Sequence, residues 1–233
     1  MEIRAGTSGF SYKEWKGSFY PEDLSAGDML SYYAERLPTV EINNTFYRMP
    51  KPEVLESWAA QTGDEFRFVL KASRRITHFK RLKDVEDEVD YFLRSAGTLR
   101  ERLGAVLFQL PPNLKKDLER LGAFLARLGD PTRVAFEFRH PSWHEADVID
   151  LLGDTGAALC TADTEEAAGS IVRTGPLGYL RLRRADYSSD DLATWAARVR
   201  EAGWDRAYVF FKHEDAGTGP ALARDFMRRV GGA

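Results

Sequence analysis

Eight short apolar segments, spread along the whole chain, most constrain what this sequence can fold into. They span residues 3–8, 39–43, 66–71, 105–109, 134–139, 158–163, 179–183 and 207–212. Each is nearly continuous in apolar character, as are parallel strands that are covered on both faces. Amphipathic runs with helical spacing lie between most of them, at residues 28–37, 52–61, 84–103, 114–128, 143–152, 190–202 and 220–230. This alternation predicts an α/β fold of the TIM type, a parallel (β/α)8 barrel.

Length and composition fit one such domain. The chain has 233 residues, of which 43% are hydrophobic and 30% are charged, so it can bury one sizeable core. It has no solenoid repeat and no Pro/Gly/Ser-rich linker. We therefore expect a single TIM-barrel domain over residues 1–233. The interval between the sixth and seventh segments is short and glycine-rich, which predicts an irregular barrel without a full helix there.

The composition also limits compartment and partners. Cys160 is the only cysteine, so an intrachain disulfide is impossible and a reducing compartment is expected. The N-terminus has no signal-peptide hydrophobic region, and no stretch reaches the ~20 apolar residues of a membrane helix. We expect a cytoplasmic protein with no membrane partner. The net charge of −3 argues against broad attraction to nucleic acid but leaves a local basic site open.

Charged or amide side chains lie at or near the ends of seven of the eight segments, and the hydroxyl of Ser8 ends the first. Strand alternation places Glu41 and Asn43 on one face and their aliphatic neighbours on the other. Because helices cover the outside of a barrel, we expect the polar face to point inward at the C-terminal rim, where active sites of this fold lie. The rim set is Glu41, Asn43, Lys71, Gln109, Glu137, Arg139, Asp163, Arg181, Arg183 and Lys212.

Cations outnumber anions in this rim set, which favours a small anionic ligand carrying phosphate or carboxylate. A glutamate there can act as general acid or base if its neighbours shift its pKa toward neutrality. The candidate catalytic residues are Glu41, Glu137, Asp163 (to orient a cation) and His78 in the loop after the third strand. A layer of mutually paired charges, needing no ligand, is the structural alternative.

A divalent metal is a second possibility for the same rim. Its carboxylates, with His78, His140 or His213, could supply oxygen and nitrogen ligands. The spacings HxxxH and HExxH are both absent, and the neighbouring Lys and Arg side chains would repel a cation. The sequence therefore requires no cofactor and assigns no metal ligand.

The connection after the first strand is long and aromatic, with Phe10, Tyr12, Trp15, Phe19 and Tyr20. These rings can stack on a sugar or a base, or they can pack on one another as a lid. Tyr12 and Trp15, with the Ser8 hydroxyl, are candidate substrate-binding residues.

Ordered motifs run through nearly the whole chain. They are Gly6-Thr7-Ser8-Gly9-Phe10 with Tyr12 and Trp15, Phe19-Tyr20-Pro21, residues 40–47 (VEINNTFY), 68–71, 76–78, 104–112 and 137–143 (EFRHPSW), Asp163, Tyr187, and Phe210-Phe211. Together they resemble the YecE-like proteins of domain-of-unknown-function family 72. The resemblance implies a TIM-type barrel and adds Tyr47 to the candidate substrate-binding residues, but it implies no particular activity.

Two places depart from that family's usual pattern. The chain has Arg183-Arg184 where members commonly have His-Gly, and Lys212-His213 where they commonly have paired Asn. Both changes add positive charge at the rim and strengthen the expectation of an anionic ligand.

Three functions fit these observations. The leading one is an enzyme, a hydrolase or a lyase, that clamps a phosphate- or carboxylate-bearing substrate with Arg and Lys. The second is a nucleic-acid phosphodiesterase or repair-type barrel whose aromatic loop stacks on bases. The third is a non-catalytic metabolite-binding protein. The sequence specifies neither the substrate nor the oligomeric state.

Overall fold

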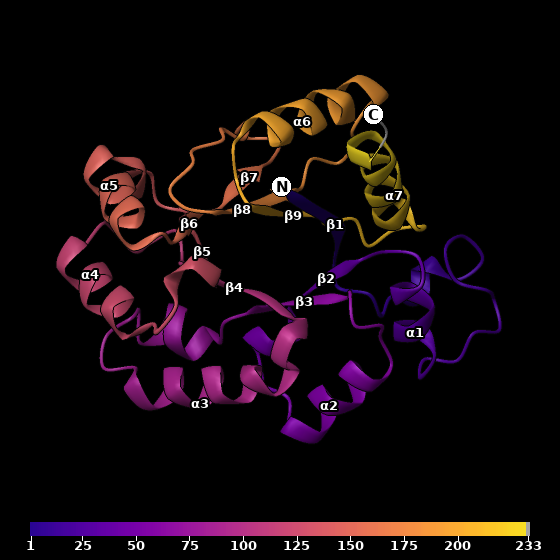
Figure 1. Ribbon diagram of the computed structural model, residues 1–233, viewed down its shortest axis with the longest axis horizontal. Helices are drawn as coiled ribbons and strands as arrows, with labels where there is room; N and C mark the ends of the chain where they lie inside the picture. The colour runs from indigo at the N-terminus through magenta and orange to yellow at the C-terminus, as the bar shows by residue number, and fades with distance from the viewer. Residues whose placement is uncertain (232–233) are drawn as a thin grey trace.

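The computed structural model describes residues 1–231 and confirms the TIM-type barrel. Its parallel strands form one sheet in the order β6-β5-β4-β3-β2-β1-β9-β8-β7. The strands are β1 (Glu2–Ser8), β2 (Thr39–Ile42), β3 (Arg67–Lys71), β4 (Leu103–Gln109), β5 (Val134–Glu137), β6 (Ala158–Leu159), β7 (Thr161–Asp163), β8 (Leu177–Leu182) and β9 (Arg206–Phe211). Figure 1 shows the helices arranged around this ring of strands.

Seven α-helices follow the predicted amphipathic runs. They are α1 (Met29–Ala34), α2 (Pro52–Ala60), α3 (Glu86–Ala96), α4 (Leu118–Arg127), α5 (Ala146–Thr155), α6 (Ser189–Glu201) and α7 (Thr218–Gly231). Local capping sets some of their bounds. The α4 helix begins after Asp117 because that side chain accepts a hydrogen bond from the Arg120 amide. None of the helices within residues 1–231 is both long and apolar enough to cross a membrane.

The predicted sixth strand is divided at Cys160, which accounts for nine strands rather than eight. The first part, β6, pairs with β5, and the second part, β7, pairs with β8. Between them, the Cys160 amide donates to the Phe136 carbonyl oxygen at 2.8 Å. The barrel is therefore nearly closed, with one seam. The expected irregularity is also confirmed, because residues 164–176 contain no helix.

The barrel has two hydrophobic cores. One fills the space between strands and helices and includes the Phe108, Phe136 and Phe211 rings. The other fills the barrel interior and consists of Val69, Ala105, Leu107, Ala135, Ala158, Cys160, Leu177, Tyr179, Tyr208 and Phe210. Alternate residues of a strand point to the same face, so the residue two positions after each of these interior residues also points into the barrel. The interior core is thus capped at the C-terminal rim by polar side chains.

Candidate functional site

Arg181, at the end of β8, links two buried carboxylates across the barrel. Its Nη2 lies 2.9 Å from Glu41 Oε1, and its Nη1 lies 2.5 Å from Glu137 Oε2. All three side chains are almost completely buried. Removing such charges from water is costly unless they are paired and hydrogen-bonded. The Glu41–Arg181–Glu137 bridge is therefore a fixed part of the rim rather than a set of free ligand-binding groups.

Glu41 is the most fully satisfied member of the bridge. Its Oε1 accepts hydrogen bonds from Ser8 Oγ at 2.7 Å and from Asn43 Nδ2 at 3.2 Å, and its Oε2 accepts one from Tyr179 Oη at 2.6 Å. Ser8 and Asn43 thus orient Glu41. Tyr179 was not among the residues expected at the site. The alternation signal could have found it, because it precedes Arg181 by two positions on the same strand.

Both glutamates are held ionised, so their neighbours do not shift their pKa values toward neutrality, which was the condition for either to act as general acid or base. Burial alone would raise the pKa of Glu137, but Arg181 and Arg139 outweigh it and lower the pKa to about 2. Burial also opposes the ionisation of Glu41. The charge of Arg181 and the hydrogen bonds from Tyr179 and Ser8 outweigh this effect and lower the pKa of Glu41. Their pKa values lie far from neutrality, so neither carboxylate is well matched to proton transfer at pH 7.

Positive charge exceeds negative charge around this bridge. Arg139 Nε and Arg183 Nη1 approach the same oxygen, Glu137 Oε1, at 3.3 and 3.5 Å. Their side chains remain 36% and 23% exposed, in contrast to Arg181. Within residues 1–231, the buried Nε of Arg183 has no hydrogen-bond partner. These groups can donate to an oxyanion that reaches the rim.

Lys71 and His78 lie on the β3 side of the site and share a contact with Phe46. Lys71 Nζ donates to Gln109 Oε1 at 2.8 Å and lies 4.1 Å from the centre of the Phe46 ring. Burial, together with Arg181, lowers the pKa of Lys71 to about 8. The His78 ring meets Phe46 edge to face, with 4.9 Å between centroids. Burial and Lys71 lower the pKa of His78 to about 4, so this ring is neutral at pH 7.

His78 belongs to an irregular turn rather than to a flexible loop. The π-helical segment η3 (Arg75–Phe79) follows β3, and Thr77 Oγ1 lies 2.9 Å from His78 Nδ1. Single π-turns are often found at functional sites. Of these groups at the rim, Lys71 has the pKa nearest neutrality, about 8, and is therefore better matched to proton transfer at pH 7 than His78, Glu41 or Glu137.

Asp163 lies outside this cluster, which corrects its expected place in the barrel interior. Ala158 and Cys160 occupy the inward positions of the sixth segment, so Asp163 points to the opposite face. There it accepts hydrogen bonds from the Gly169 amide and Tyr187 Oη, both at 2.8 Å. It also pairs with Arg184 Nε at 3.0 Å. Asp163 therefore does orient a cation, but that cation is Arg184, away from the Glu41–Arg181–Glu137 bridge.

The expected ligand contact of Trp15 is corrected, and Lys212 lies apart from the charge cluster. Trp15 is fully buried and packs against Tyr12, Phe19 and Tyr20, with ring centroids 4.8 to 6.0 Å apart. The aromatic loop thus packs largely on itself, as the lid alternative predicts. Lys212 follows the end of β9, is 41% exposed, and lies 3.9 Å from Glu214 rather than in the charge cluster.

Tyr12 and Tyr47 remain accessible at the rim. Tyr12 Oη donates to the Ser8 carbonyl oxygen at 2.7 Å, and burial raises the pKa of Tyr12 to about 12. Together with Asn43 and Trp58, Tyr12 lines a cavity of about 130 Å³ beside β1 and β2. Tyr47 is 64% exposed. Both side chains can therefore be reached by a ligand.

The arrangement does not favour a metal. Arg181 occupies the space between Glu41 and Glu137, where a bridging cation would have to lie. Within residues 1–231, His, Cys, Asp and Glu side chains form no cluster of three or more suited to a metal ion. His140 and His213 are used elsewhere: His140 Nδ1 lies 2.8 Å from Ser142 Oγ, and His213 Nε2 lies 2.7 Å from the Arg184 carbonyl oxygen.

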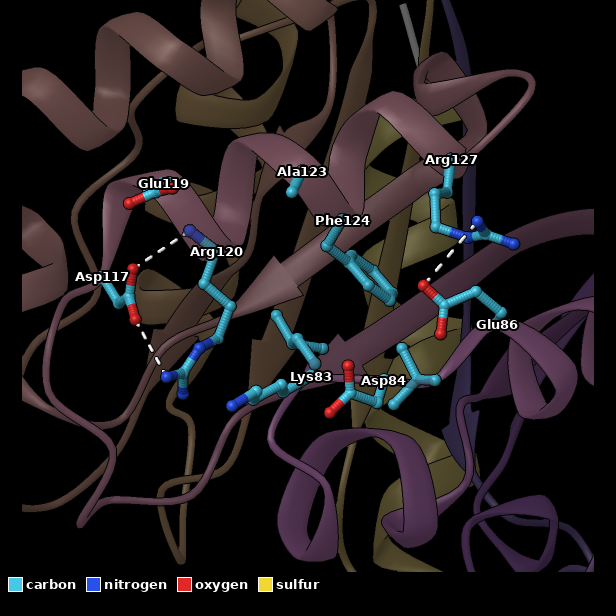
Figure 2. Close-up of a pocket in the computed structure, with 11 residues that line it drawn as sticks. Lys83, Asp84, Glu86, Asp117, Glu119, Arg120, Ala123, Phe124 and Arg127 are labelled. Atoms are coloured by element: carbon cyan, nitrogen blue, oxygen red, sulfur yellow. Dashed lines mark hydrogen bonds and ion pairs between the residues drawn. The ribbon is translucent and has the colours of Figure 1, made fainter.

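A larger groove, of about 470 Å³, lies between residues 82–86 and helix α4 (Figure 2). Its two arginines are paired with carboxylates, Arg120 with Asp117 at 3.0 Å and Arg127 with Glu86 at 3.7 Å. None of its charged side chains is buried, in contrast to those of the barrel rim. We therefore place the candidate site at the rim and not in this groove.

Curated relatives match part of the chain. It is 37% identical to the UPF0759 protein YecE of Escherichia coli K12 over 115 residues, which are 49% of this chain and 42% of YecE. It is 30% identical to the UPF0759 protein YunF of Bacillus subtilis 168 over 135 residues, which are 54% of this chain and 48% of YunF. The chain thus matches somewhat less than half the length of each of these relatives.

Solved structures match over nearly the whole chain. The crystal structure of a DUF72 family protein, TM1631 of Thermotoga maritima MSB8, superposes with a TM-score of 0.85 and 27% identity over 99% of this chain and 100% of that one. For EF0366 of Enterococcus faecalis V583, also a DUF72 family protein, the TM-score is 0.77, with 21% identity over 100% and 98% of the two chains. The sequence profile described as "Protein of unknown function DUF72" matches residues 4–233. With its motifs, barrel and sequence profile in agreement, the chain belongs to the DUF72 family.

Proposed function

We propose that this protein is an enzyme that binds a small phosphate- or carboxylate-bearing substrate at the C-terminal rim of its barrel. The observation that carries the proposal is the charge excess around the Glu41–Arg181–Glu137 bridge. Lys71, Arg139, Arg181 and Arg183 surround two carboxylates. Arg181 is neutralised by both carboxylates, so the remaining cations are available for a ligand.

In this proposal, Arg139 and Arg183 hold the anionic group. Both share one glutamate oxygen at long distances and keep part of their guanidinium groups exposed. A phosphate or carboxylate group can accept two parallel hydrogen bonds from one planar guanidinium group. The Glu41–Arg181–Glu137 bridge keeps these arginines in place, while Lys71, with a pKa of about 8, supplies the proton transfers.

A thermal-shift panel with sugar phosphates, carboxylic acids and nucleotides tests the proposal. A compound that binds only the folded protein raises its melting temperature, and that compound is then assayed for turnover. We expect Arg183→Met to abolish the shift while the unliganded protein stays folded. Lys115→Met, at an exposed lysine in the connection between β4 and α4, is the matched control. A shift unchanged by Arg183→Met would refute this ligand position, and binding without turnover would favour the non-catalytic alternative.

A specific surface feature favours nucleic acid as the second candidate ligand. Arg74 lies 5.3 Å from the centres of both the Tyr47 and Phe79 rings, which are 64% and 68% exposed. Residues 71–83 contain six Lys or Arg residues and no Asp or Glu. Exposed rings and local positive charge are what single-stranded nucleic acids bind.

Fluorescence anisotropy of labelled single-stranded oligonucleotides tests this second candidate. It predicts binding that weakens steeply with salt and that is lost in a Tyr47→Ala/Phe79→Ala variant. Absence of binding at low salt would remove nucleic acid from the list of ligands.

A further inference from the structure

We propose that Lys71 is a nucleophile that forms an imine with the carbonyl group of an aldehyde or ketone substrate bearing a phosphate or carboxylate. The inference rests on the proposed function, because Arg139 and Arg183 would hold the anionic end of that substrate. It restricts the reactions that the enzyme can catalyse to those that proceed through a protonated imine.

The surroundings of Lys71 are those of an amine kept from full protonation. Its side chain is buried at the end of β3. Burial is the largest effect that opposes its positive charge, Arg181 and Arg139 add to it, and Glu41 and Glu137 favour the charge. The resulting pKa of about 8 leaves a substantial neutral fraction at pH 7.5. Reactive lysines in enzymes are commonly activated by burial or by a neighbouring cation.

The Lys71 amine is held by contacts that leave its lone pair usable. Gln109 Oε1 accepts one N–H at 2.8 Å, and the Phe46 ring lies beneath the nitrogen at 4.1 Å. No carboxylate forms a salt bridge with Lys71 among residues 1–231, whereas both rim carboxylates pair with arginine. A lysine retained only for structure would be expected to share one of these carboxylates.

The chemical step balances without an oxidant or reductant. The Nζ lone pair attacks the carbonyl carbon, a C–N bond forms, and the carbonyl π electrons move to oxygen, which takes up a proton. The carbinolamine then loses its oxygen as water, which leaves a protonated imine. The amine gives up one proton and the departing oxygen takes up two, so the step consumes one proton from solvent overall.

Pyridoxal 5′-phosphate, used only as a phosphate-bearing aldehyde reagent, tests this inference on the wild-type protein. After borohydride reduction, peptide mapping measures the labelling rate of each lysine. We expect Lys71 to label at least about tenfold faster than exposed Lys115 at pH 7.5, because far more of its amine is unprotonated. Pyridoxal, which has the same aldehyde but no phosphate, is the matched reagent, and we expect it to label Lys71 more slowly. A Lys71→Arg variant should lose the fast-labelled site.

The outcomes separate this inference from the proposed function. Labelling of Lys71 no faster than that of Lys115 by both reagents would overturn the nucleophile, even if phosphate binding is found by calorimetry. Fast but equal labelling of Lys71 by the two reagents would support the nucleophile and contradict an anion site beside it. Fast labelling that requires the phosphate group supports both.

Discussion

At the scale of single residues, Arg181 matters most because two buried carboxylates depend on it. Replacing Arg181 with Met would leave Glu41 and Glu137 buried and without their common cation. Breaking a buried ion pair in this way typically costs about 3–5 kcal/mol. We expect a loss of that size in the free energy of unfolding, measured in urea. Arg139→Met removes a partly exposed partner of Glu137 and should cost less than about 1 kcal/mol. Equal losses in the two variants would contradict the bridging role of Arg181.

The pH dependence of stability should report the ionisation of Glu137. Its pKa is lowered on folding to about 2, so ionised Glu137 contributes stability that is complete above its unfolded pKa of about 4.5 and is lost as the pH falls toward 2. The difference in free energy of unfolding between the wild type and Glu137→Gln should therefore shrink between pH 6 and pH 2. A difference that stays constant over this range would show that Glu137 is not held ionised.

We expect Lys71 to lower the free energy of unfolding of the protein, as residues that are retained for function often do. Its pKa is lowered on folding, so the protonated form destabilises the native state below pH 8, and the penalty fades as the pH rises toward 10.5. We expect Lys71→Met to raise the free energy of unfolding at pH 7 by about 1–3 kcal/mol, with a smaller gain at pH 10. Lys115→Met should change it by less than about 0.5 kcal/mol. A Lys71→Met variant less stable than the wild type at pH 7 would indicate a structural role.

At the scale of elements, the contact of β1 with β2 positions the bridge. Ser8 on β1 donates to Glu41 on β2, and the two residues are paired in the ladder. Earlier along β1, Gly6 lies so close to the Thr39 carbonyl group that a Cβ atom there would overlap it. A side chain at Gly6 would therefore push these strands apart just below the site.

The substitution Gly6→Ala tests this close approach. We expect it to lower the free energy of unfolding by about 2 kcal/mol or more, because backbone rather than a flexible side chain must move. The control is Gly122→Ala in α4, where an added Cβ meets nothing within 4 Å. That change should stabilise the helix by about 0.5–1 kcal/mol. If both variants were as stable as the wild type in urea, the strands would have more freedom than the structure indicates.

At the scale of the whole molecule, local alternation was enough to predict the barrel and most of its rim. The inward faces of β2, β3, β4, β5 and β8 follow from counting alternate positions back from the polar residue at or near the end of each apolar segment. Asp163 was misplaced because small Ala158 and Cys160 fill the interior without a strong hydrophobic signal. The Arg181–Glu41 contact joins residues 140 positions apart, so no local pattern could reveal it. The burial of Trp15 likewise depends on packing between distant residues.

Calorimetric titration of inorganic phosphate tests the central claim, that the excess rim cations bind an anion, most directly. The wild type is compared with an Arg139→Met/Arg183→Met variant and with Lys115→Met at the same ionic strength. We predict phosphate binding to the wild type and to Lys115→Met, and at least about tenfold weaker binding, equal to about 1.4 kcal/mol, to the double variant. Binding of equal strength to all three proteins, or to none of them, would contradict an anion site at the barrel rim.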